Sequence, residues 1–128
     1  MKALHPLADL AGRILIGLMF VLAGLNKLGN MEGTADYMAG AGVPGQLAIL
    51  VVITELGFGL LLLAGFLTRL MAFLLGGFTV IAALMFHFDP GNQMEMILFM
   101  KNMAIAGGLG IIFANGAGPL SVDGLRRR

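Results

Sequence analysis

The feature that most constrains this chain is the segment Leu47–Leu67, which is apolar or small except at Thr54 and Glu55. At about 1.5 Å per residue, a helix of this length spans roughly 31 Å, which matches the hydrocarbon core of a bilayer. Glu55 would then lie about 12 Å below one interface. Because an ionised carboxylate in lipid costs at least about 3 kcal/mol, Glu55 must be neutral, paired with a cation, or directed into a polar cavity.

The composition indicates an integral membrane protein embedded in a lipid bilayer. Apolar residues make up 59% of the chain and charged residues only 12%, whereas soluble domains carry about 25% charged residues. We expect an all-α fold, a single domain over residues 1–128, with four membrane-spanning helices at about 7–28, 47–67, 70–88 and 94–114. The first of these contains Arg13, so it is predicted to be a span and not a cleavable signal peptide.

The distribution of cations predicts the orientation in the membrane. Four spans form an up-down-up-down bundle with both termini on one side, and a short Thr68-Arg69 connection makes the second and third helices antiparallel neighbours. Lys2, Arg69 and the arginines at 126–128 lie on the side of the termini, so the positive-inside rule places both termini in the cytoplasm. Three terminal arginines are too few for an extended basic surface, so we expect a headgroup anchor and no nucleic-acid binding.

Residue types limit the cofactors that this chain could hold. It has no cysteine, which excludes covalently attached haem and a cysteine-ligated iron–sulfur cluster. The two histidines, His5 and His87, are predicted on opposite sides of the membrane and could not ligate one haem together. We therefore expect no metal site within the chain.

Ionisable side chains inside the spans form the candidate site. On the first helix one stripe carries a base at each end, Arg13 and Lys27, with glycines between them. By predicted depth, each of the four helices contributes one group to the outer half of the bundle. The predicted catalytic residues are Glu55, His87 and Lys101, and the predicted ligand-binding residues are Arg13, Lys27, Asn102 and Arg69.

Two structural alternatives stay open at this level. A buried Glu55–Lys101 ion pair could serve only to fix the helix register, since buried pairs add little net stability. Arg13 has an acid, Asp9, four residues earlier and could simply pair with it. Four ionisable groups from four helices exceed what register requires, and intramembrane ionisable residues indicate a functional site by default. The pattern therefore favours a ligand-binding or proton-handling site.

Motifs along the whole chain resemble the DoxX family of small four-helix bacterial membrane proteins. The residues that carry the resemblance are Arg13-Ile14-Leu15, Gly24-Leu25-Asn26-Lys27, Gly42-Val43-Pro44, Glu55-Leu56, Gly65-Phe66-Leu67-Thr68-Arg69, His87, Lys101-Asn102, Gly116-Ala117-Gly118 and Ser121-Val122-Asp123. The resemblance implies a multi-pass protein of the bacterial inner membrane. The family takes its name from a membrane subunit of a thiosulfate:quinone oxidoreductase, which implies an oxidoreductase subunit, a non-covalent quinone and a redox partner subunit.

Three functions remain open on the sequence. The first is a quinone-interacting subunit, in which His87 or Lys101 donates to a quinone carbonyl and Glu55 relays protons. The second is a small transporter or channel for an anion or weak acid, which would have to form a homo-oligomer because four helices are few for a pathway. The third is an assembly or scaffold protein that binds a partner helix through its glycine faces.

Overall fold

The computed structural model describes residues 3–126, and this part of the chain is all-α. Four helices are long and apolar enough to cross a membrane: His5–Leu28, Gly45–Ala64, Thr68–His87 and Gln93–Asn115. The protein is therefore a multi-pass membrane protein, as predicted. Lys2, Arg127 and Arg128, on which part of the orientation argument depends, lie outside the described residues.

The spans are built from these elements in order. The first span is α1 (His5–Leu28), and a short helix α2 (Met31–Gly40) follows it. The second combines η1 (Gly45–Leu47), α3 (Ala48–Val52), the π-helical segment η2 (Ile53–Phe58) and α4 (Gly59–Ala64). The third is α5 (Thr68–Ala82) with the π-helical segment η3 (Ala83–His87), the fourth is α6 (Gln93–Asn115), and α7 (Val122–Arg126) ends the described chain. Single π turns occur frequently at functional sites, and here they hold Glu55 and His87.

The second span ends three residues earlier than the sequence suggests. Gly65 adopts a left-handed φ of 75°, and two bonds close the helix: the Phe66 N–H donates to Leu61 O and the Gly65 N–H to Leu62 O. This pair is a Schellman motif, which uses a glycine because a side chain would be strained there. The connection to α5 is therefore 65–67, and Thr68 already belongs to the third span.

Helix α2 lies where only a polar loop was expected. The side chain of Asn30 accepts a hydrogen bond from the Gly33 N–H at 3.1 Å and caps the start of the helix. Its end is closed by bonds from the Gly42 N–H to Ala39 O and from the Val43 N–H to Met38 O. Both boundary signals are present in the sequence, although they bracket a segment too short and polar to span a bilayer.

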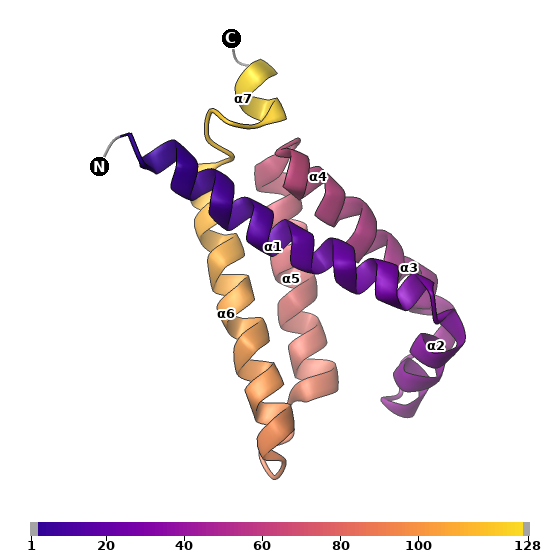
Figure 1. The fold of residues 1–128 in the computed structure, drawn as a ribbon. Coiled ribbons are helices and arrows are strands. Elements are labelled where there is room, and N and C mark those ends of the chain that lie inside the picture. The colour runs from indigo at the N-terminus through magenta and orange to yellow at the C-terminus, as the bar shows by residue number, and fades with distance from the viewer. Residues whose placement is uncertain (1–2, 127–128) are drawn as a thin grey trace.

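The spans lie against one another (Figure 1). They pack through small residues and a compact apolar core. A Cβ atom added to Gly24 of α1 would lie 2.8 Å from the backbone nitrogen of Leu56 in η2, so only glycine permits this approach. The buried core consists of Phe20, Leu62, Met71, Ala72, Leu75 and Leu109. The N-terminal part of α1 lies near α7 at one end of the molecule, and α2 lies at the other. We call these the terminal end and the α2 end.

Candidate functional site

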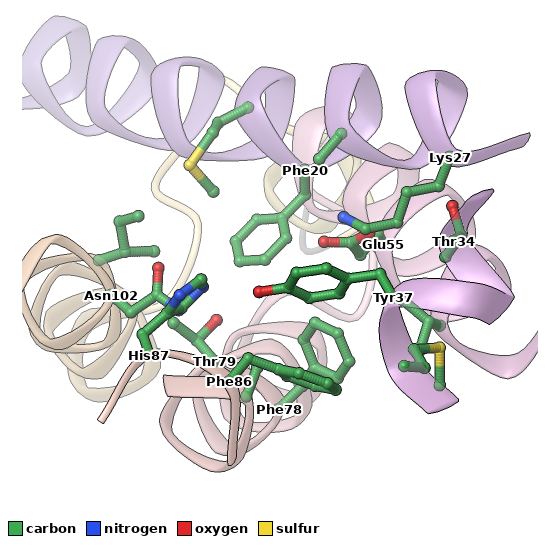
Figure 2. Close-up of a pocket in the computed structure, with 16 residues that line it drawn as sticks. Phe20, Lys27, Thr34, Tyr37, Glu55, Phe78, Thr79, Phe86, His87 and Asn102 are labelled. Atoms are coloured by element: carbon green, nitrogen blue, oxygen red, sulfur yellow. The ribbon is translucent and has the colours of Figure 1, made fainter. Parts of the chain in front are cut away.

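A cavity of about 370 Å³ lies between the helices at the α2 end (Figure 2). All four spans and α2 contribute to its wall. Much of the wall is aromatic or aliphatic, and the polar groups are few. Its lining residues are Met19, Phe20, Ala23, Lys27, Thr34, Tyr37, Met38, Val51, Glu55, Phe78, Thr79, Ala82, Phe86, His87, Asn102 and Ile105.

An acid–base pair forms one side of the cavity. The Lys27 Nζ lies 2.7 Å from Oε1 of Glu55, and Glu55 is only 7% exposed. The close approach at Gly24 explains this pair, because Lys27 follows Gly24 by one helical turn and Glu55 directly precedes Leu56. The contact is close but lacks the angles of a well-directed hydrogen bond, and Oε1 has no other partner among residues 3–126. The carboxylate therefore keeps unused capacity to accept a hydrogen bond.

A second acid–base pair lies across the cavity from the first. Nδ1 of His87 is 3.0 Å from Oε2 of Glu95. Glu95 is placed in the first turn of α6, where the side chain of Asn92 accepts from its backbone N–H at 3.1 Å. An ionised Glu95 can accept a hydrogen bond from the Nδ1–H of His87, which leaves Nε2 of the ring available to the cavity. Glu95 was not among the residues predicted from the sequence.

Tyr37 of α2 lies between the two pairs. Its ring stacks on Phe86 with centroids 5.6 Å apart, and its hydroxyl points into the cavity toward His87 (Figure 2). Tyr37 is 57% exposed overall, but its partial burial, and secondarily the negative charge of Glu95, raise the pKa of the phenol above its ordinary value of 10.0. The phenol therefore stays protonated at neutral pH and can donate a hydrogen bond. Sequence reasoning missed this residue, although it is the single tyrosine of the chain and follows the helix-start signal at Asn30.

Of the predicted site residues, the structure brings four to the cavity: Lys27, Glu55, His87 and Asn102. Lys101 is exposed on α6 and does not line the cavity. The predicted structural alternative of a Glu55–Lys101 pair is wrong, because Glu55 pairs with Lys27 instead. The reason is packing: α1 lies directly against η2 at Gly24, so Lys27 reaches the carboxylate.

The other two predicted residues, Arg13 and Arg69, lie at the terminal end. Arg13 is 2% exposed and donates to three carbonyls, those of Leu62 at 3.2 Å, Leu63 at 2.6 Å and Leu120 at 2.5 Å. These bonds tie the end of the second span to the C-terminal segment.

Among residues 3–126, Arg13 and Asp9 form no close ion pair, although the charge of Asp9 still acts on the guanidinium. Asp9 instead lies 3.4 Å from His5. Asp123 joins the same junction and accepts from the backbone N–H groups of Leu67 and Thr68. Arg69 is exposed beside Gly116. Both predicted arginines are thus remote from the cavity.

The arrangement can bind a flat molecule with acceptor atoms on opposite edges. Aromatic walls suit a planar ring, and protonated donors approach from both sides. Within residues 3–126, no three His, Asp or Glu side chains come together in a way that could hold a metal ion.

Fold and site together define a small multi-pass helical membrane protein with an ionisable cavity inside its spans. The chain belongs to the DoxX family, whose family model matches residues 8–88. This confirms the resemblance seen in the sequence.

Named relatives support the same assignment. The chain is 40% identical to the inner membrane protein YqjF of Escherichia coli K12, over 98% of this chain and 96% of the relative. It is 34% identical to the inner membrane protein YphA of the same organism, over 94% and 91%. A third relative, named "Putative oxidoreductase CatD", from Bacillus subtilis 168, is 33% identical over 73% of each chain. No solved structure matches. The protein is accordingly a multi-pass protein of the inner membrane.

Proposed function

We propose that this protein is a quinone-interacting subunit of a membrane oxidoreductase. The observation that carries the proposal is the pair of acid–base couples, Lys27–Glu55 and His87–Glu95, that face each other across one aromatic cavity. A 1,4-quinone has a flat apolar ring and a carbonyl acceptor at each end, which is the complement of this site. The relative named as an oxidoreductase supports the same class of activity.

The residues of the cavity fit such a ring. The volume of about 370 Å³ is at the small end of the range of roughly 300–1,000 Å³ typical of ligand sites. Lys27 can donate to one carbonyl, and Tyr37 can donate to the other. His87 can also donate to that carbonyl through Nε2 in its imidazolium form, in which both ring nitrogens carry a proton. Phe20, Phe78 and Phe86 offer faces for stacking.

The two couples can also handle protons. Reduction of a quinone to a quinol takes up two electrons and two protons, with one proton added to each ring oxygen. Lys27 and His87 stand where they can deliver these protons, and Glu55 and Glu95 hold and reorient the donors. A redox partner subunit would supply the electrons.

The proposal includes an orientation. Arg69 and Arg126 lie at the terminal end, so the positive-inside rule places that end in the cytoplasm and the cavity near the outer face. Protons would then reach the cavity from the outer side. The alternative of an anion pathway has less support, because the apolar core around Phe20 and Leu62 lies between the cavity and Arg13.

The test uses Tyr37 as a built-in probe. It is the single tyrosine and the chain has no tryptophan, so tyrosine emission reports on the cavity alone, and a bound quinone should quench it. The double variant Lys27→Met/Glu55→Gln removes the pair without leaving a buried charge unpaired. We expect it to bind a benzoquinone at least about tenfold more weakly in lipid vesicles, which add no tyrosine or tryptophan, as loss of a charge-assisted hydrogen bond requires.

Lys101→Met is the matched control, since Lys101 is an exposed lysine of a span outside the cavity. Its affinity should equal that of the wild type. Equal quinone affinity in the wild type and the double variant, or no quenching of the wild type at all, would refute the proposed function.

A further inference from the structure

A second hollow adjoins the cavity on its lipid-facing side. It is a groove of about 260 Å³ between the second and third spans, and we call it the lateral groove. Six residues line only the groove: Val43, Leu47, Leu50, Thr54, Ile81 and Met85. Five others line both the groove and the cavity: Met38, Val51, Phe78, Ala82 and Phe86. One layer of side chains therefore forms the boundary between the two spaces.

The groove offers no polar group to a ligand. Its single hydroxyl, that of Thr54, donates to the backbone carbonyl of Leu50 at 2.8 Å. Its rim is open to the surroundings, with Leu50 55% and Ile81 58% exposed. In a bilayer these side chains contact hydrocarbon, so an occupant of the groove must itself be a hydrocarbon.

We infer that the lateral groove holds the hydrocarbon tail of the ring that binds in the cavity. The substrate class is then a lipid-soluble quinone with an alkyl or isoprenoid tail, as opposed to a water-soluble ring. This inference rests on the proposed function and deepens it. The polar couples bind the ring, and the tail passes out between the second and third spans when side chains of the shared boundary move aside.

Two residues at the shared boundary suit this passage. Met38 is 4% exposed, but its unbranched side chain has three rotatable bonds and can move aside for a ligand. Phe86 lines both spaces and stacks on Tyr37. It therefore borders the tail and also supports Tyr37, whose hydroxyl contacts the ring. A ring can thus enter sideways from the bilayer while its tail remains in an apolar environment throughout.

The groove is expected to act through shape and not through added hydrophobic affinity. A tail outside the groove already lies in hydrocarbon, so moving it into the groove gains little from the hydrophobic effect. Filling the groove, however, leaves a bound tail no room. Because overpacking an apolar site is unfavourable, a filled groove should weaken tailed ligands roughly tenfold, which corresponds to about 1.4 kcal/mol.

The experiment compares one ring with and without a tail, on the wild type and two double variants in lipid vesicles. The probes are a tailless dimethoxy-methyl-benzoquinone and the same ring bearing a decyl chain, both measured by quenching of Tyr37. Leu50→Phe/Ile81→Phe fills the groove without adding tyrosine or tryptophan emission. Leu60→Phe/Ile111→Phe is the matched control, because both residues are exposed on spans but do not line the groove.

We expect the groove variant to bind the decyl compound about tenfold more weakly and the tailless ring as the wild type does. The control should bind both compounds normally. If the groove variant binds the decyl compound as tightly as the wild type does, the inference is overturned and the groove is occupied by bulk lipid. In that case, normal binding of the tailless ring still supports the proposed function. If neither probe binds to the wild type, both the proposed function and the inference about the groove are refuted.

Discussion

The stability of the terminal end depends on Arg13. Its guanidinium donates to the carbonyls of Leu62, Leu63 and Leu120, and two of these belong to the last turn of α4. Replacement by methionine keeps a long apolar stem but removes all three bonds and the positive charge. The Leu62 carbonyl keeps the Gly65 N–H as a donor, whereas the carbonyls of Leu63 and Leu120 lose the guanidinium. Leaving a buried carbonyl unsatisfied costs about 1–3 kcal/mol for each group.

These costs do not add fully, since the freed segment relaxes and can take up water. We therefore expect Arg13→Met to lower the free energy of unfolding by about 2–4 kcal/mol, somewhat less than the full sum for two unsatisfied carbonyls. Arg13→Lys should recover only part of this loss, because one ammonium group cannot reach all three acceptors. Unfolding by SDS in mixed micelles, followed by far-ultraviolet circular dichroism, measures the difference.

Arg69→Met is the matched control, since Arg69 is an exposed arginine at the same end, and we expect it to change stability by less than about 0.5 kcal/mol. If Arg13→Met unfolds like the wild type, the three bonds are not what holds this end together. The guanidinium would then be available for a ligand, as the sequence alone suggests.

Two further predictions follow from the α2 end. Because the pKa of Tyr37 is raised, a pH titration followed by phenolate absorbance should have its midpoint above 10.0. Glu95→Gln should lower that midpoint only partly, because burial is the larger cause of the shift. The stability that Tyr37 contributes is complete below 10.0 and is lost as the pH rises through the pKa of the folded state; an unshifted midpoint contradicts the placement. Gly24→Ala should cost about 1–3 kcal/mol through its clash with Leu56, whereas Gly12→Ala, which meets nothing within 4 Å, should be neutral or slightly stabilising.

The identity of the lysine that pairs with Glu55 could not be predicted from the sequence. The stripe on the first helix from Arg13 to Lys27 was predicted, and its positions 13, 17, 20 and 24 are buried. The sequence could not decide which lysine meets the carboxylate, because Lys27 and Lys101 were both expected in the outer half. That choice depends on which helices touch, and the contact at Gly24 decides it.

Helix α2 illustrates a different limit. Its start and end signals are local and readable, but the sequence does not show that the helix folds over the cavity and brings Tyr37 to His87. The pair formed by His87 and Glu95 depends similarly on the reversal at residues 88–92, which places the first turn of α6 beside the end of the third span. Such contacts depend on the geometry of the loops, which the hydrophobic periodicity of the sequence does not predict.

The sequence by itself determined that this protein lies in a lipid bilayer, how many spans it has and that ionisable groups lie within them. These properties follow from hydropathy and from the length of a bilayer-spanning helix. Tertiary structure alone decided the roles of the charged residues. Arg13 became a structural donor and Lys27 a partner of Glu55, while Lys101 stayed at the surface. The reason is physical: in lipid a charge must find its partner within the protein, and which partner is in reach depends on how closely the backbones pack.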